Sequence, residues 1–132
     1  SVEEIELIKQ HPVKGERILG QSRDLKDKLF VACIRSHHER YDGTGYPDGL
    51  AGEKIPIMAR IIAISDAFDA MTTLRPYRQK LSTNEALAEL KRCAGSQFDP
   101  WLVKIFCNMM AEDQFQAARS RNRPMQLQTI TG

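Results

Sequence analysis

The segment from Ser36 to Gly52 limits what this chain can fold into more than any other, because adjacent histidines lead straight into a turn. Its sequence reads SHHERYDGTGYPDGLAG. Glycine allows backbone conformations that other residues avoid, and proline fixes its own, so this composition predicts an ordered loop rather than a flexible linker. Two imidazoles beside such a loop are typical of a metal site.

Apolar residues at three- and four-residue steps before the histidines predict a helix from Leu25 to about Arg40. On that helix His37 continues the buried face, whereas His38 and Glu39 project away from it. A buried neutral imidazole needs a partner, which a metal ion or a buried carboxylate would provide.

The rest of the chain has the same helical periodicity and no convincing strand, so the fold class expected is all-α. Helices are expected from Val2 to Gln10, Pro12 to Leu19, Pro56 to about Thr73, Ser82 to Cys93 or Ala94, and Asp99-Pro100 to Asp113, with capping boxes at Ser1 with Glu4 and at Ser82 with Glu85. Their buried faces are expected to be Val2, Ile5 and Ile8; Ile57, Ile61, Ile64, Phe68 and Met71; and Leu102, Ile105, Phe106 and Met109. Residues 1–113 are predicted to form one domain, and residues 114–132 a polar tail or linker.

The charge balance argues against one class of partner, and the cysteines indicate the redox compartment. The chain has 19 basic and 17 acidic residues, and a net charge of +2 is too balanced to indicate a nucleic acid polymer as partner. Cys33, Cys93 and Cys107 are widely spaced within apolar helical patterns, which predicts buried free thiols and a reducing, cytoplasmic setting. No run approaches the ~20 apolar residues of a membrane span.

Several polar residues have two interpretations when they are taken alone. A lone histidine such as His11 is more often a surface or capping residue than a metal ligand. Asp66 and Asp69 share a helix face that begins apolar, where a carboxylate needs a cation or a hydrogen-bond donor. By composition, a salt bridge to Arg60 or Arg75 is the default partner for these carboxylates.

Two arginines and a tyrosine leave similar alternatives open. Arg75 and Arg78 lie around a proline-stiffened turn, and their forked donors suit phosphate oxygens, unless they pair on the surface with Glu53 or Glu85. Tyr46 either contacts a bound nucleotide or forms a hydrophobic plug under its loop.

Together these segments resemble the HD-GYP family of cyclic di-GMP phosphodiesterases. Several separate motifs agree with the family in order and spacing, over residues 5–107. They are HPxxG at 11–15, HHE at 37–39, DGxGYP at 42–47, a glycine-to-isoleucine segment at 49–61 and D..DAMT..RPYR at 66–78.

The resemblance implies roles for individual residues. Metal ligands are expected at His11, His37, His38 and Asp66, and substrate-binding residues at Tyr46, Asp69, Arg75 and Arg78. The ligand set implies two or three divalent transition metal ions in the intact domain, with iron or manganese favoured over zinc. The family's His-Asp pair and its nearby lysine would lie upstream of Ser1, so no catalytic residue is expected within this chain. The fold expected is an N-terminally truncated, HD-domain-like helical bundle with an ordered GYP loop.

The parent protein is accordingly expected to hydrolyse cyclic di-GMP to linear pGpG, to GMP, or to both, while the chain itself has an incomplete metal centre. The alternative is a non-catalytic HD-GYP remnant that binds a cyclic dinucleotide or docks onto a protein, such as a diguanylate cyclase domain, through the Tyr46 loop. A phosphohydrolase of the broader HD class is disfavoured, because the GYP loop and the RPYR segment are both intact.

Overall fold

The computed structural model describes residues 2–21 and 28–121, and within them it is all-α, as predicted. The elements in order are α1 (Val2–Lys9), α2 (His11–Gln21), α3 (Lys28–Ser36), the short 3-10 helix η1 (Gly52–Lys54), α4 (Ile57–Thr72), α5 (Thr83–Arg92) and α6 (Pro100–Arg121). None of these helices is both long and apolar enough to cross a membrane.

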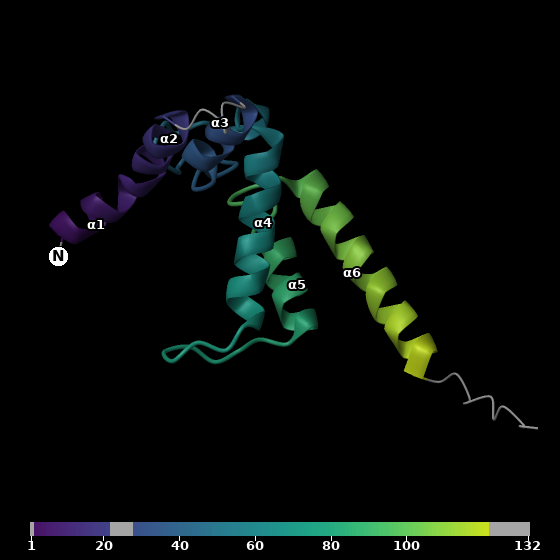
Figure 1. Cartoon of the computed structure of the whole chain (residues 1–132). Helices are drawn as coiled ribbons and strands as arrows, with labels where there is room; N and C mark the ends of the chain where they lie inside the picture. The colour runs from purple at the N-terminus through teal and green to yellow at the C-terminus, as the bar shows by residue number, and fades with distance from the viewer. Residues whose placement is uncertain (1, 22–27, 122–132) are drawn as a thin grey trace, which may run out of the picture.

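Helix α4 is the central element (Figure 1). Helices α2 and α3 pack together at the end where α4 begins. Helix α5 packs against α4, whereas α6 contacts α4 with its first part and then diverges from it (Figure 1). The connection from α4 to α5 lies at the opposite end of α4, away from α3 (Figure 1). The arrangement therefore separates the histidine turn after α3 from the arginine-containing segment after α4.

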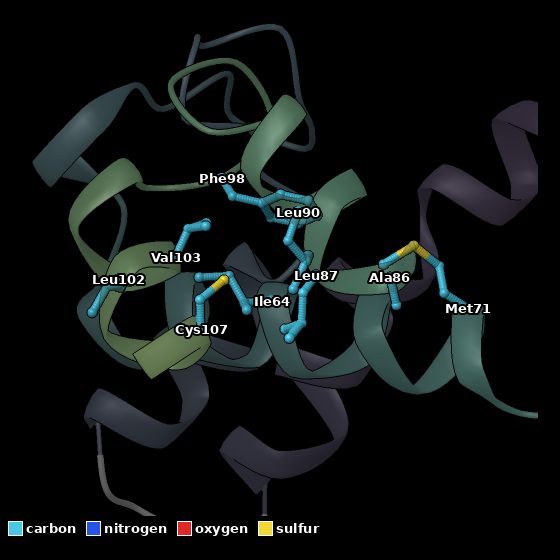
Figure 2. Packing of buried hydrophobic residues seen from close by; sticks show 9 residues of the cluster. All are labelled: Ile64, Met71, Ala86, Leu87, Leu90, Phe98, Leu102, Val103 and Cys107. Carbon is cyan, nitrogen blue, oxygen red and sulfur yellow. The ribbon is translucent and has the colours of Figure 1, made fainter. Parts of the chain in front are cut away.

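The hydrophobic core lies between α4, α5 and α6 (Figure 2). Its buried members are Ile64, Met71, Ala86, Leu87, Leu90, Phe98, Leu102, Val103 and Cys107. Phe68 and Phe106 add an edge-to-face ring contact with centroids 5.2 Å apart. Burying each large side chain of this kind contributes roughly 1.5–3 kcal/mol, so this cluster is what fixes α4.

Several faces predicted to be buried are exposed in the described part of the chain. Ile57 and Ile61 of α4 are exposed, and so are Ile105 and Met109 of α6. The core uses the neighbouring line of α4 through Ile64, which leaves Ile61 and Ile105 to line a groove of about 260 Å³ between α4 and α6. The stripe Val2, Ile5 and Ile8 is likewise exposed, because α1 packs mainly against a single described helix, α2.

Two helix ends differ from the sequence prediction, and two predicted starts lie outside the described residues. Helix α2 continues through Gly20 to Gln21, because one glycine in a last turn costs only about 1 kcal/mol of helix propensity. Helix α6 continues to Arg121, so residues 114–121 of the predicted tail are helical, and the domain boundary after residue 113 stays a prediction. The capping box at Ser1 and the start of a helix at Leu25 fall outside the described ranges.

Helix α3 ends at Ser36, whereas the periodicity predicts a helix to about Arg40. The reason is that the next backbone groups bond to other parts of the chain. The His38 carbonyl accepts from Tyr46 N at 3.3 Å, and Tyr41 N and Asp42 N donate to the carbonyls of Gln97 and Ser96 at 3.2 and 2.9 Å. His37 and His38 therefore lie in a turn after the helix, and not one after the other on its surface.

Residues 42–52, which we call the GYP loop, fold back onto this turn at Gly45. A Cβ atom at Gly45 would lie 2.7 Å from both Glu39 Cα and His38 O, and it would also clash with Arg40 N. These are backbone atoms, which cannot swing aside as the end of a side chain can. Only glycine lets the loop approach the histidine turn this closely.

A buried ion pair connects the start of α4 to the start of α6. Arg60 Nη1 donates to Asp99 Oδ2 at 2.6 Å, and Asp99 Oδ1 accepts from Trp101 N and Leu102 N at 2.9 and 3.3 Å. Asp99 is thus both the ion-pair partner and the N-terminal cap of α6. Composition favoured a salt bridge from Arg60 to Asp66 or Asp69. That prediction is wrong, because Arg60 pairs with Asp99.

Replacing Asp99 by alanine is expected to lower the free energy of unfolding by about 3 kcal/mol or more, because it removes a cap and leaves the Arg60 guanidinium buried without its partner. Ser82→Ala is the matched control, since Ser82 caps α5 through a capping box and pairs with no cation. That variant should lose only about 1 kcal/mol. Urea denaturation measures both, and equal losses would contradict the role given to the ion pair.

Replacing Gly45 by alanine is expected to displace the GYP loop and to destabilise the chain by roughly 1–3 kcal/mol, because the new methyl group would overlap backbone. Gly20→Ala is the control: no described atom lies within 4 Å of the Cβ position there, and helix propensity should improve stability by up to about 1 kcal/mol. Amide hydrogen exchange and urea denaturation report both effects. Unchanged protection of the loop amides in Gly45→Ala would refute the close approach.

Candidate metal centre

All three histidines of the chain meet at one point, although they come from two separate segments. His11 is the first residue of α2, and His37 and His38 form the turn after α3. One ring nitrogen from each lies within 4.8 Å of the others, and His38 Nε2 is 2.9 Å from His11 Nε2. The packing of α2 against α3 creates this cluster.

Backbone carbonyls orient two of the three rings. His11 Nδ1 lies 2.6 Å from Ile8 O, and His37 Nδ1 lies 2.7 Å from Ile34 O. Because a carbonyl can only accept, each ring donates its proton from Nδ1 and keeps the lone pair on Nε2. Both residues use the carbonyl three positions earlier, and an oriented imidazole of this kind is what a metal ligand requires.

His38 completes the cluster as a neutral ring. The pKa of His38 is lowered to about 4, mainly by burial and also by the neighbouring His37 and His11, while the Asp66 carboxylate acts in the opposite direction. At pH 7 the imidazole is therefore uncharged. With the Nε2 lone pair of His11 aimed at His38 Nε2, either a proton or a cation must lie between the two nitrogens. Imidazole nitrogens gathered in this way are a donor set that suits a divalent transition metal.

Asp66 lines the same hollow as two of the histidines. The hollow has a volume of about 230 Å³, and its lining includes His37, His38, Gln97 and Asp66 of α4. The Asp66 carboxylate does not belong to the group of atoms that lie within 4.8 Å of one another. The structure therefore brings three of the four predicted ligands together and leaves the fourth beside the same hollow, outside that group.

Tyr46 covers one face of His38. Their ring centroids are 5.1 Å apart with an interplanar angle of 17°, and the tyrosine is half-buried. The ring is thus a packing element between the GYP loop and the histidine cluster. Its contact with a ligand stays a prediction.

The other predicted substrate-binding residues lie elsewhere on the surface. Asp69 of α4 is exposed and accepts a hydrogen bond from Thr73 Oγ1 at 3.2 Å. Arg75 and Arg78 lie in an exposed turn closed by the bond from Arg78 N to Arg75 O at 3.3 Å. Among the described residues neither guanidinium forms a salt bridge, so the predicted alternative of surface pairing with Glu53 is not observed there, and Glu85 bonds to its own cap instead.

Glu39 is a residue of this site that the sequence prediction missed. It was expected to project away from the buried face, but it is 4% exposed. Its Oε1 accepts from Asp48 N at 2.7 Å and its Oε2 from Leu50 N at 3.0 Å. The sequence does contain a signal for this role: Glu39 directly follows the histidines and precedes a loop whose backbone N–H groups need acceptors.

Arg35 fastens the same loop from α3, which the sequence prediction also missed. Its Nε and Nη2 donate to the two carboxylate oxygens of Asp48 at 2.7 and 2.8 Å, and its Nη1 donates to Glu16 of α2. The guanidinium holds the pKa of the Asp48 carboxyl below its usual range. One side chain therefore connects α2, α3 and the GYP loop.

Comparison with known proteins agrees with this geometry. The HD domain family model matches residues 1–102. The chain is 40% identical over 124 residues to the cyclic di-GMP phosphodiesterase response regulator RpfG of Xanthomonas campestris pv. campestris, covering 90% of this chain and 33% of that protein. It is also 40% identical over 110 residues to a cyclic di-GMP phosphodiesterase of Thermotoga maritima, covering 83% of this chain and 30% of the relative.

A solved structure gives the same result at the level of the fold. The cyclic GMP-AMP-specific phosphodiesterase V-cGAP3 of V. cholerae superposes with a TM-score of 0.70 at 28% identity, over 85% of this chain and 25% of that one. The chain thus spans about a third or less of the length of the relatives it matches. These matches, with the motifs at the histidine turn and the GYP loop, show that the chain belongs to the HD-domain family and to its HD-GYP group.

Proposed function

We propose that this chain is the larger, C-terminal part of a metal-dependent phosphodiesterase domain whose substrate is cyclic di-GMP. The observation that carries the proposal is the cluster of three histidine nitrogens within 4.8 Å, beside a hollow that also contains Asp66. The names of the similar proteins from X. campestris and T. maritima support the substrate. A 34% identical relative from Vibrio cholerae is named a 3'3'-cGAMP-specific phosphodiesterase, so a hybrid dinucleotide is the closest competitor.

The ligands proposed for the metal are the Nε2 atoms of His11 and His37, a ring nitrogen of His38, and the Asp66 carboxylate. Two or three ions, with iron or manganese favoured over zinc, would supply Lewis acidity to the scissile phosphate and a bound water of lowered pKa. The chain's own residues hold the ring nitrogens in place through the carbonyls of Ile8 and Ile34. A two-metal centre needs more ligands than these four, and we infer that a His-Asp pair and a lysine outside this sequence complete it.

The proposed substrate contacts lie outside the lining of this hollow, in the GYP loop, on α4 and in the α4–α5 connection. Tyr46 would contact the dinucleotide from the GYP loop, and Asp69 would hydrogen-bond to it from α4. Arg75 and Arg78 carry forked donors that suit phosphate oxygens, and neither forms a salt bridge with a described residue, although the charge of Arg78 helps to lower the pKa of the Glu89 carboxyl. A loop or side-chain movement toward the hollow would bring these guanidinium groups to the substrate.

A binding role without catalysis is the second candidate. The limited ligand set favours it, because three imidazoles and one carboxylate would bind an ion more readily than they would complete a two-metal centre. In that case the GYP loop would carry a cyclic dinucleotide or a protein partner such as a diguanylate cyclase domain. Upstream protein sequence containing the His-Asp pair would favour the enzyme.

The 132-residue chain, purified without chelator, is expected to contain iron, manganese or zinc by elemental analysis. His37→Ala and His38→Ala should each weaken the binding of Mn²⁺ or Zn²⁺ by at least about 100-fold, because each removes a ligand. Loss of a residue that only supports a ligand typically lowers metal affinity 10–100-fold, so loss of the ligand itself should cost at least as much. Glu53→Gln, an exposed change on η1, is the control. A folded wild type with no metal affinity, or histidine variants that bind as well as the control, would exclude the proposed centre.

In the full-length protein, turnover of cyclic di-GMP is expected to fall by at least about 1,000-fold in His37→Ala and Asp66→Asn, since metal ligands support the chemical step itself. Arg75→Ala and Arg78→Ala should instead act mainly by raising KM, roughly 10-fold each, because they bind phosphate in the ground state as well. Separating the products by chromatography distinguishes pGpG from GMP. A full-length protein that binds cyclic di-GMP and never hydrolyses it would favour the binding role.

A further inference from the structure

We propose that Glu39 is a positioning residue, whose carboxylate ties the GYP loop to the histidine turn and thereby fixes the ring of His38 beneath Tyr46. This role deepens the function proposed above and rests on it, because it takes His38 to be a metal ligand. The contacts that hold the loop and the His38 ring do not depend on a metal, so they can be tested without metal or substrate.

The first step is that the Glu39 carboxylate is buried and serves the loop alone. It is 4% exposed, and within the described residues no lysine or arginine forms an ion pair with it. Its two oxygens each accept one backbone N–H, from Asp48 at 2.7 Å and from Leu50 at 3.0 Å. A buried carboxylate is tolerated only where donors of this kind replace water. These contacts therefore indicate that the Glu39 carboxylate holds the GYP loop closed.

The second step is that the same short segment positions a candidate metal ligand. Glu39 directly follows His38, whose carbonyl accepts from Tyr46 N at 3.3 Å. The Tyr46 ring stacks on the His38 ring at 5.1 Å, two residues before Asp48, whose amide bonds to Glu39. Loop and turn are thus attached through a carboxylate, a carbonyl and a ring pair within a few residues. Moving the loop away from Glu39 would also uncover His38.

The third step separates Glu39 from the other attachment of the loop. Arg35 holds Asp48 through its carboxylate, with both partners roughly one third exposed. Water can replace that ion pair if it breaks. The bonds to Glu39 are better shielded, because the carboxylate that accepts them is 4% exposed and each bond is part-buried. Losing this acceptor leaves two backbone donors without their protein partner, so Glu39 is the more shielded of the two contacts that hold the loop next to His38.

Glu39→Gln is the informative change, because it keeps the size of the side chain and removes one acceptor. A glutamine oxygen can accept from one loop amide, but its NH₂ group would face the other amide, donor against donor. We expect the stack of Tyr46 on His38 to loosen. Because supporting contacts of a metal ligand typically change affinity 10–100-fold, we also expect Mn²⁺ or Zn²⁺ affinity to fall by about 10-fold or more.

The decisive measurement is the imidazole NMR spectrum of the metal-free chain, which contains only three histidines. Tyr46→Leu removes the tyrosine ring and so gives the chemical shift of His38 without the ring current of that neighbour. Glu53→Gln, on the exposed η1, is the control for loss of a carboxylate. In Glu39→Gln the His38 signal should move toward its position in Tyr46→Leu, while helix content by circular dichroism stays the same. A His38 signal that stays at its position in Glu53→Gln would overturn the proposal.

A conservative variant keeps the test decisive if Glu39→Gln does not fold. Glu39→Asp retains both acceptor oxygens on a stem that is shorter by one methylene, so its His38 signal should lie between those of the wild type and Tyr46→Leu. A wild-type signal in Glu39→Asp would then overturn the positioning role. If the wild-type chain proves unable to bind metal, the function proposed above fails while these signals still report on Glu39. The two proposals therefore fail separately.

Discussion

The structure depends on the abrupt end of α3 at Ser36, where the backbone exchanges helical hydrogen bonds for bonds to distant segments. The His38 carbonyl bonds to the GYP loop, and Tyr41 and Asp42 bond to the turn that precedes α6. The histidine turn, the GYP loop that follows it and the distant turn before α6 are thereby joined at one point. If α3 continued, the two histidines would spread around its surface. Because it ends, they meet His11 from α2 instead.

Two buried carboxylates make this junction rigid, each by a different type of contact. Asp99 neutralises Arg60 and caps α6, so it connects α4 to α6. Glu39 accepts only backbone amides and connects the GYP loop to the histidine turn. Both are 4% exposed. Fixed contacts of this kind would hold the nitrogen atoms of the candidate metal centre in place without an ion, which is the condition for tight and specific coordination.

The sequence prediction was correct where a structural signal is local. The capping box of Ser82 with Glu85 and the start of α6 after Asp99 are confirmed, because a cap involves residues within one turn of each other. It was wrong where the answer depended on a distant partner. The length of α3, the burial of Glu39 and the partner of Arg60 are all decided by segments that periodicity cannot place.

The sequence by itself therefore determined that the chain is helical, where most helices begin, and which motifs mark the candidate site, since these follow from propensity, caps and residue identity. Tertiary structure alone decided that His11 joins His37 and His38, that Asp66 lines the hollow without joining this cluster, and which apolar faces form the core. The physical reason is that a hydrogen-bond donor can bond to many different acceptors and an apolar stripe can pack against many different surfaces. Only the folded chain specifies that surface.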